Sequence, residues 1–417
     1  MMSGERARHV QHATRRPAIV LCQNVTGLAT MRALAQTGVE VHCFLFEAHA
    51  LARFSRYGKK VPLYGKHHDE PFLLRFLTEY CEKLGDRPVV FPSSDGMALF
   101  LAKYALQLRA CCTFSSTSHD ELVGLVSKDG LYRNAAAAGV GTVPNLVTQD
   151  AGAIAAWSLV HPAPYLLKPF YESIDTYRPF GKNIMLATRE DLLDYVAQFG
   201  TRSVIVQRMI EGGDGYIFDC YGYCDRDGRV LTMASHRRLR QQPPNFGSTC
   251  FGEIPANFGA DTDRQIFRDT EQLLAKVRYH GIFGIEWLYE RATGRFYVID
   301  FNARPFLTIG HLHACGLNLP ALAYQDLIGQ LPVTIDRTPA LQHLLWMDLM
   351  RDIITVHEAA ANSLVALKVW LSTLLRCRSF AYQSWRDPGP GIAMLLAIAH
   401  KCATYLGKIL RGRSEVP

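Results

Sequence analysis

The pattern of apolar and polar positions predicts that the chain begins with a parallel α/β unit. An apolar run at 18–22 is followed by a turn at Gly27, a helix, and a second apolar run at 39–46. Two strands joined through a helix pair in parallel. The later strand PVVFPSSD ends in Ser94 and Asp95, and ligands of open α/β sheets bind at such strand ends. The sequence therefore predicts a parallel sheet with a ligand site at one edge.

From about Lys128 the pattern changes to a helix closed by Gly139, followed by short strands and hairpins. The expected elements are strands at 164–170 and 203–212, a helix near 189–199, an antiparallel hairpin turning at Asp227-Gly228, and a helix over about 262–279. A chain of 417 residues is too long for one ordinary core, so we expect two to four subdomains.

Three polar residues interrupt the otherwise apolar stretch FYVIDFNARP. Because side chains alternate along a strand, Asp300, Asn302 and Arg304 should share one face. By the same alternation, Ile299 and Phe301 should share the other. A carboxylate, an amide and a guanidinium in a row are costly to bury without partners, so the face that carries them is a candidate site.

The preceding strand, FGIEWLYE, supplies a second carboxylate to this face. We expect Glu290 to pair with Phe296 across the connecting loop, which at constant register places Glu286 directly opposite Asp300. Two carboxylates at one cross-strand pair repel unless a proton or a cation lies between them. Together with the amide oxygen of Asn302 they offer three hard oxygen ligands, which suits Mg²⁺. The alternative is that both carboxylates face solvent and pair with lysines.

Composition excludes several classes of protein. With 48% hydrophobic and 20% charged residues the chain is globular, and its 11 cysteines include no CxxC pair, which favours a reduced, cytoplasmic protein with buried thiols. Glu47 lies 20 residues after Gly27, where a ribose-binding acid would lie, but the Gly-x-Gly-x-x-Gly of dinucleotide-binding folds is absent. The basic segment 1–16 has no apolar core, so it is not a signal peptide, and no apolar run is long enough for a transmembrane helix.

The net charge of +7 is concentrated near the C-terminus. Residues 364–417 carry eight basic and two acidic side chains, so the body of the chain shows no nucleic-acid footprint. Two apolar helices are expected at about 363–375 and 391–410. The second has an apolar stripe that includes Ile392 and Leu395, which favours packing on the parent domain or on a partner subunit. Docking on an anionic membrane surface is the alternative.

Taken together, the segments GIEWLYERATGRFYVIDFNARP and GLNLPALAYQDLIG resemble the metal-binding end of the ATP-grasp superfamily. The segment HRRLRQQPPNFGS is similar to the Arg-rich, Gln-Pro-containing segment of its carboxylate–amine ligase-like, "predicted carboligase" branch. The resemblance covers roughly residues 17 to 330 and implies an α/β (α+β) ATP-grasp fold. The implied divisions are a disordered basic tail (1–16), a Rossmann-like pre-ATP-grasp domain (17–125), ATP-grasp subdomain A (126–205), subdomain B with the metal site (206–330) and a helical basic C-terminal extension (331–417).

The resemblance also implies roles for individual residues. Glu286, Asp300 and Asn302 become ligands of Mg²⁺ or Mn²⁺, with Asp300 standing where most relatives have the longer Glu. Arg304 and Lys168 would act on the transferring phosphoryl group. The residues expected to bind ATP are Lys128, Lys168, Lys182, Gln207, Arg208, Asp214 and the backbone at Ile210. The residues expected to bind the substrate are Ser94, Asp95, Arg56, Arg237 and Arg240, and Arg238 is expected to face the phosphates or an anionic substrate with its neighbours.

The implied chemistry begins with attack of a substrate carboxylate on the γ-phosphate of ATP. This step gives an acyl phosphate and ADP, and an amine then displaces phosphate. Catalysis would come from positioning and from neutralising phosphate charge, without a side-chain nucleophile. Two other readings stay open, namely other ATP-grasp chemistry (carbamoyl-phosphate or carboxyphosphate type, or ligation to a thiol) and a nucleotide-binding scaffold without turnover. The expected partners are a small-molecule carboxylate and an amine, and a homodimer is also compatible with the sequence.

Overall fold

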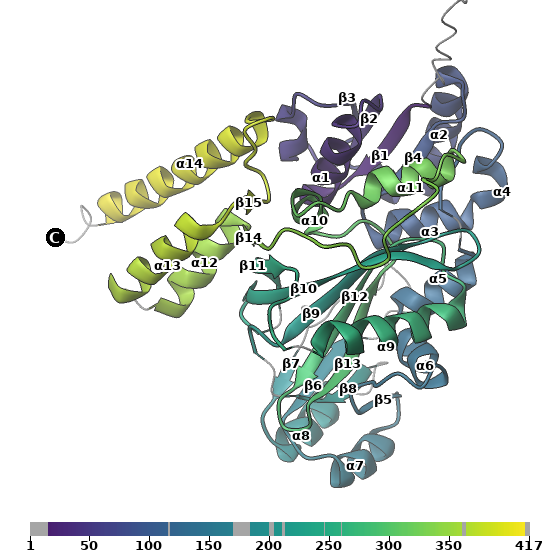
Figure 1. The fold of residues 1–417 in the computed structure, drawn as a ribbon. Coiled ribbons are helices and arrows are strands. Elements are labelled where there is room, and N and C mark those ends of the chain that lie inside the picture. Colours follow the sequence, from purple (N-terminus) through teal and green to yellow (C-terminus); the bar gives the residue numbers. More distant parts are fainter. Residues whose placement is uncertain are drawn as a thin grey trace, which may run out of the picture.

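The computed structural model describes residues 16–115, 117–169, 184–199, 204–210, 213–245, 247–259, 261–360 and 364–412. In these residues the strands form three sheets. Figure 1 shows the N-terminal sheet at one end of the body, the largest sheet in the middle and the third sheet, with two helices beneath it, at the other end. Lys182, predicted to bind ATP, lies outside the described residues.

The N-terminal domain is built on a four-stranded parallel sheet in the order β3-β2-β1-β4, which confirms the predicted parallel unit. Its elements are β1 (Ala18–Cys22), α1 (Asn24–Ala35), β2 (Val41–Leu45), η1 (Leu51–Phe54), β3 (Lys59–Pro62), η2 (Lys66–His68), α2 (Glu70–Leu84), β4 (Val89–Pro92), α3 (Asp95–Lys103), α4 (Ala105–Leu108) and α5 (His119–Val126). The predicted turn at Gly27 is wrong, because Gly27 lies inside α1. A Cβ at this position would come within 2.7 Å of Cys22 Cα, so glycine lets α1 pack closely on β1.

The central sheet has seven strands in the order β13-β12-β9-β10-β11-β14-β15. Its elements and their neighbours are α6 (Lys128–Ala137), β9 (Ile217–Cys224), β10 (Val230–Gln242), β11 (Ser248–Ile254), α9 (Thr262–Val277), β12 (Gly281–Glu290), β13 (Arg295–Asn302), α10 (Ile309–Ala314) and α11 (Leu319–Leu327). One face of this sheet is sealed by an apolar core in which Trp287 and Phe301 pack with side chains of α5, α6 and α9. The polar residues of the same strands are therefore left on the opposite face.

The third sheet is antiparallel, in the order β5-β8-β6-β7, and its elements lie close to the predicted positions. They are β5 (Asn145–Thr148), α7 (Ala151–Val160), β6 (Tyr165–Pro169), β7 (Ile184–Leu186), α8 (Arg189–Phe199) and β8 (Val204–Arg208). Ile154 of α7 and Leu192 of α8 are fully buried against the strands. This small layered unit presents the end of β8 to the central sheet.

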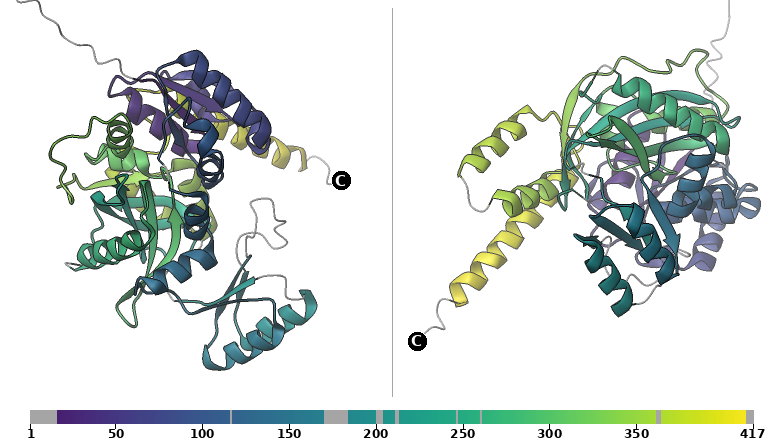
Figure 2. Two further views of the ribbon diagram at one scale, coloured as in Figure 1. Left: turned by 90° about the vertical axis from the view of Figure 1, so that its right-hand side faces the viewer. Right: turned by 90° about the horizontal axis from the view of Figure 1, so that it is seen from below.

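The segment after residue 331 is more than the helical extension that the sequence predicts. Its elements are β14 (Leu344–Met347), α12 (Leu349–Ala360), α13 (Leu364–Arg376), β15 (Ser379–Phe380) and α14 (Gly389–Gly412), and both strands join the central sheet. The hairpin α12–α13 and the helix α14 project from the body as two arms on the same side of the molecule (Figures 1 and 2). Among the described residues, no helix is both long and apolar enough to cross a membrane.

Candidate functional site

The hairpin β12–β13 places Glu286 directly opposite Asp300, as the sequence predicts. The register slips beyond this pair, because Trp287 pairs with Val298 and leaves Ile299 as an extra, bulged residue. The predicted pairing of Glu290 with Phe296 is therefore wrong by one residue, and Glu290 pairs with Arg295.

The bulge also changes the face on which Ile299 lies. Ile299 does not join Phe301 in the large core but packs in a small apolar cluster with Leu288 and Ile210. Leu288 lies two residues after Glu286 and so shares its face. The strand therefore presents an apolar patch next to its polar residues, and this patch reaches the end of β8.

The carboxylate pair continues as a row across four strands. Asp300 of β13 pairs with Glu286 of β12, Glu286 pairs with Asp219 of β9, and Asp219 pairs with His236 of β10. Directly paired residues in a sheet point to the same face, so these four side chains lie side by side. Three carboxylates in adjacent positions require cations or protons around them.

Arg238 is one of these cations, and it bridges the two inner carboxylates. Its Nη2 lies 2.7 Å from Glu286 Oε1 and 2.6 Å from Asp219 Oδ1, while His236 Nδ1 lies 2.6 Å from Asp219 Oδ2. Burial alone would raise the pKa of Asp219, but Arg238 and His236 lower it below its ordinary value. Burial would also lower the pKa of Arg238, yet Asp219 and Glu286 raise it well above its usual range. This part of the row is held in the charged state.

Lys128, the first residue of α6, neutralises the outer carboxylate. Its Nζ donates to Asp300 Oδ1 and, at 2.8 Å, to the backbone carbonyl of Ile299. Burial favours the neutral amine, but the adjacent Asp300 carboxylate outweighs it and raises the pKa of Lys128. The lysine, which in the sequence alone resembles a surface residue, is thus part of the cluster.

Arg304 connects the row to the N-terminal domain. Its guanidinium donates to Asn302 Oδ1 at 2.8 Å and to both carboxylate oxygens of Asp95 at 3.0 and 3.1 Å. Asp95 begins α3, and Ser94 caps this helix by accepting a hydrogen bond from Met97 N. The structure therefore brings Asp95 to the cluster, whereas the hydroxyl of Ser94 is engaged in the cap.

The residues around Asp300 have the chemistry of a divalent-cation site. Glu286, Asp300 and Asn302 are hard oxygen donors on one face, and the side chains of Glu286 and Asp300 are 17% and 37% exposed. Glu286 Oε1 is engaged by Arg238, whereas Oε2 has no hydrogen-bond partner among the described residues. An ion could therefore reach Glu286 from the open side without displacing Arg238, and the donor set fits Mg²⁺ or Mn²⁺.

The end of β8 lies beside the apolar patch of the hairpin. Ile210 is 4% exposed and packs with Leu288 and Ile299, while Gln207 accepts a hydrogen bond from Tyr132. Arg208 pairs with Glu290 at 2.8 Å, and Lys168 lies half-buried on the neighbouring strand β6. Leu288 is 8% exposed, so Ile210 and Leu288 form a largely buried apolar cluster, and Ile299 is its half-buried member. The exposed edge of such a cluster is suited to a flat heteroaromatic ring.

Several predicted residues are not brought to this cluster. Arg237 alternates to the other face of β10, where it donates to the carbonyl of Gly215 and stacks on Phe258, so it is not part of the site. Arg240 forms two 2.8 Å hydrogen bonds with Asp352 of α12, so its guanidinium binds the C-terminal extension and not the cluster.

Arg56 and Asp214 also have other neighbours. The backbone amide of Arg56 donates to Asp387, and its exposed side chain lies over the ring of Tyr57. Asp214 accepts hydrogen bonds from Gln241 and from the backbone of Asn245 at the end of β10.

Sequence reasoning missed Asp219 and His236. Asp219 is a single acid in the apolar strand IFDCYGYC, a pattern that resembles a buried polar residue of no special role. The signal that could have found it is its alternation with the neighbouring hairpin, but this requires knowing that β9 lies next to β12. That pairing joins strands separated by more than fifty residues, and it is fixed by tertiary packing.

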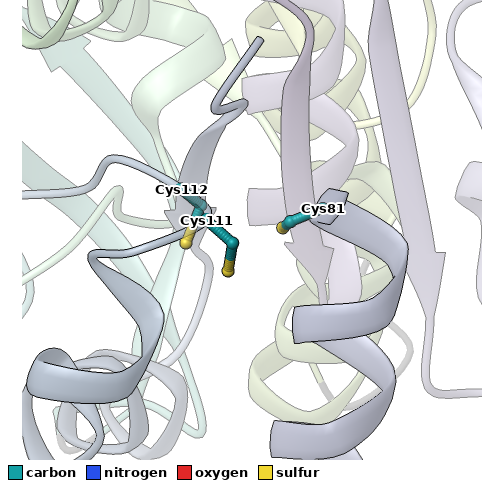
Figure 3. Close-up of side chains that lie close together, drawn as sticks. All are labelled: Cys81, Cys111 and Cys112. Carbon is teal, nitrogen blue, oxygen red and sulfur yellow. The ribbon is translucent and has the colours of Figure 1, made fainter. Parts of the chain in front are cut away.

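Three buried thiols gather elsewhere, in the core of the N-terminal domain. Cys81 of α2 points towards Cys111 and Cys112, and the three sulfur atoms lie within 4.8 Å of one another (Figure 3). A hydrogen bond with Cys112 and burial raise the pKa of Cys81, and burial raises the pKa of Cys111 to about 11, whereas the hydrogen bond with Cys81 lowers the pKa of Cys112. The cluster is part of the core, as the sequence predicts for its cysteines.

Comparisons with known proteins identify the fold. A scan against protein-family models gives no match. Among solved structures, the chain is similar to N5-carboxyaminoimidazole synthetase from Staphylococcus aureus (TM-score 0.62, 12% identity, 83% of this chain and 86% of that chain). It is also similar to biotin carboxylase from Campylobacter jejuni (TM-score 0.62, 15% identity, 79% of this chain and 74% of that chain). The chain has the ATP-grasp fold, which confirms the predicted fold class.

Two further similarities involve ligases that act on amino acids. An L-amino acid ligase from Bacillus licheniformis has a TM-score of 0.54 with 16% identity over 75% of this chain and 74% of that chain. A D-aspartate ligase from Enterococcus faecium (strain Aus0004) is 24% identical over 185 residues, which are 41% of this chain and 42% of the relative. The match thus spans less than half of this curated relative.

Proposed function

We propose that the protein is an ATP-dependent ligase that activates a small-molecule carboxylate as an acyl phosphate, releases ADP and joins the acyl group to an amine. The observation that carries this proposal is the charged row on the central sheet, where the carboxylates of Glu286 and Asp300 lie among Lys128, Arg238 and Arg304 beside an apolar patch. Such a site can bind a metal–polyphosphate and a base at the same time. The ATP-grasp fold and the similarity to two amino acid ligases support it.

In this proposal Glu286, Asp300 and Asn302 would hold Mg²⁺ or Mn²⁺. When bound, the ion would neutralise negative charge on the phosphates of ATP. Lys128 and Arg304 flank the same position, and their fixed charges stabilise the phosphoryl group as it passes to the substrate carboxylate. Lys168 would reach the phosphates from β6, and Lys182 keeps its predicted role beside them.

The base of ATP would lie on the apolar patch formed by Ile210, Leu288 and Ile299. The backbone at Ile210 and the side chains of Gln207 and Arg208 would bind its edge. Asp214 is engaged by Gln241 and Asn245, so its contact with the ribose stays a prediction.

The substrate carboxylate would enter beside Arg304. A cavity of about 40 Å³ lies there between β4 and the hairpin, lined among others by Arg304, His280, Thr117 and Tyr279. This volume suits a group as small as a carboxylate. Asp95 holds Arg304, which lines this cavity and also contacts the row, so an acid bound there would lie near the γ-phosphate held by the row.

The setting of the reaction is also part of the proposal. The ten cysteines that the structure describes by their side chains are free and buried, which supports a reducing, cytoplasmic location. A homodimer, compatible with the sequence, stays a prediction.

The test is to incubate the protein with Mg-ATP, a panel of small carboxylates and hydroxylamine, and to measure hydroxamate and nucleotide products together. We expect hydroxamate and ADP in equal amounts, both lost in Asp300→Asn and both retained in Arg237→Gln, which alters a residue on the opposite face. Formation of AMP would overturn the proposal in favour of adenylation. Nucleotide binding without turnover on any acid, including amino acids, would favour a non-catalytic scaffold.

A further inference from the structure

The two C-terminal arms expose apolar side chains that a globular protein normally covers. The exposed fractions lie between 44% and 101% for Val369, Leu371, Leu375, Trp385, Ile392, Leu395 and Leu396. The sequence favours packing of the stripe with Ile392 and Leu395 on the parent domain or on a partner subunit, and in the structure the parent domain leaves both residues exposed. A concentration of exposed apolar residues on one extension marks an interaction surface.

The roots of the arms are fixed to the body by buried ion pairs. Asp387, just before α14, accepts hydrogen bonds from Arg32 at 2.8 Å and from Ser55 at 2.7 Å. Asp352 of α12 accepts from Arg240 and, at 2.8 Å, from Trp370 of α13. The side chains of both acids are 0% exposed. The arms therefore have a set direction, and both project away from the body on one side (Figures 1 and 2).

The charge of the two arms is mostly positive. From residue 349 to residue 412 there are eight basic residues and three acidic ones. Two of the acids, Asp352 and Asp387, are buried and paired with Arg240 and Arg32, so they do not offset the charge that faces solvent. Arg376, Arg378 and Arg386 are exposed and lie near the exposed apolar side chains of α13 and Trp385 in the sequence.

We propose that the two arms dock the protein on an anionic lipid bilayer surface. Basic side chains attract anionic headgroups, while aliphatic residues and a tryptophan enter the interface. A second copy of the chain fits less well, because it would bring two arms of the same positive sign together. The inference rests on the arms alone and does not depend on the proposed function.

Flotation of the full chain with lipid vesicles tests this docking. We expect binding to vesicles of mixed phosphatidylglycerol and phosphatidylcholine, none to phosphatidylcholine alone, and loss of binding as the ionic strength rises. The apolar variant Leu375→Gln/Trp385→Ala/Leu396→Gln and the charge variant Arg376→Gln/Arg378→Gln/Arg386→Gln should each bind at least about tenfold more weakly. The circular dichroism spectrum and the urea unfolding transition should stay unchanged in both variants, which shows that they are folded.

The matched control is Leu106→Gln/Leu159→Gln, which removes two exposed leucines from the body, 90% and 72% exposed. It should bind vesicles as the natural chain does. Equal binding by the apolar variant, or no binding by the natural chain, would overturn the proposal. A dimer in sizing experiments that the apolar variant dissociates would assign the surface to a second copy of the chain instead.

Discussion

The two ends of the central sheet use the same pairing of arginine and aspartate or glutamate, but they expose it differently. At the β13-β12-β9-β10 end, the side chains of Glu286 and Asp300 remain 17% and 37% exposed. At the other end and on the N-terminal domain, Asp352 and Asp387 are 0% exposed and each is held by an arginine of the body. The sealed pairs fix the arms in place, whereas the open end leaves Glu286 and Asp300 accessible to a metal ion or a ligand.

Strand β10 shows the difference within a few residues. Arg238 lies in the open row, Arg237 turns to the opposite face, and Arg240 is sealed against Asp352. All three are arginines in one basic segment, so composition does not separate them. What separates them is the alternation of the strand and the acid that each one meets.

The largest expected effect comes from breaking the open end. Asp300→Asn removes one of the carboxylates proposed to hold the metal, and we expect ADP formation to fall at least about a hundredfold. The free energy of unfolding should change little, because the asparagine can still accept a hydrogen bond from Lys128. Steady-state ADP release and urea unfolding measure the two quantities. If Asp300→Asn lowered the free energy of unfolding but left the rate of ADP formation unchanged, Asp300 would have a structural role and not the proposed metal-binding one.

Removing a buried ion pair at the root of an arm should have the opposite effect, with a loss of stability and no loss of activity. Arg32→Met leaves Asp387 buried without its cation, and we expect the free energy of unfolding to fall by about 3 kcal/mol, with activity retained below the transition. Urea unfolding monitored by circular dichroism gives the value. The double variant Arg32→Met/Asp387→Asn should recover part of the loss, and failure to recover would show that the pair is not the cause.

The boundary between the two ends can be probed with pH. His311 is buried between His236 of the open row and Trp346 of β14, and burial together with His236 and His343 lowers its pKa well below the ordinary value. In the folded protein His311 stays neutral, whereas in the unfolded chain it gains a proton below about pH 6.5. The contribution of His311 to the free energy of unfolding is therefore complete above that pH and is lost as the pH falls.

We expect the slope of unfolding free energy against pH, between about pH 6.5 and pH 5, to be smaller in His311→Gln by up to about 1.4 kcal/mol per pH unit. Urea unfolding at several pH values measures it. Identical slopes in both proteins would show that His311 does not titrate in this way.

The smallest effect should come from an ion pair that is neither sealed nor part of the row. Arg337 pairs with Glu271, and their side chains are 57% and 37% exposed. Arg337→Gln should change the free energy of unfolding by less than about 1 kcal/mol and leave activity intact. A larger change in thermal unfolding would mean that exposure is a poor guide to the role of ion pairs in this protein.

The central pair of the site was predicted correctly because two deviations cancel. The assumed loop register is wrong by one residue, and the bulge at Ile299 restores the pairing of Glu286 with Asp300. The alternation of the strand adds Asn302 and Arg304. The bulge at Ile299 could not be predicted, because it changes the register by a single residue and is fixed by packing against Ile210 and Leu288.

The rest of the row depends on strand neighbours that are distant in the chain. Asp219 and His236 join Glu286 only because β9 lies between β12 and β10. The positions of the Arg237 and Arg240 side chains depend on groups supplied by other segments of the chain. These groups include the ring of Phe258 for Arg237 and the carboxylate of Asp352 for Arg240. The arrangement of the C-terminal strands was missed for the same reason, since β14 and β15 are too short to stand out, and they join the sheet by pairing of β14 with β11 and of β15 with β14.

The central claim, that the open row is a magnesium–nucleotide site, is tested most directly by calorimetric titration of ATP with and without Mg²⁺. The natural chain and Arg237→Gln should bind ATP tightly only with Mg²⁺. In the presence of Mg²⁺, Glu286→Gln should bind ATP at least about tenfold more weakly than the natural chain does. Equal magnesium-dependent binding by Glu286→Gln and the natural chain, or an equal loss in Arg237→Gln, would contradict the account.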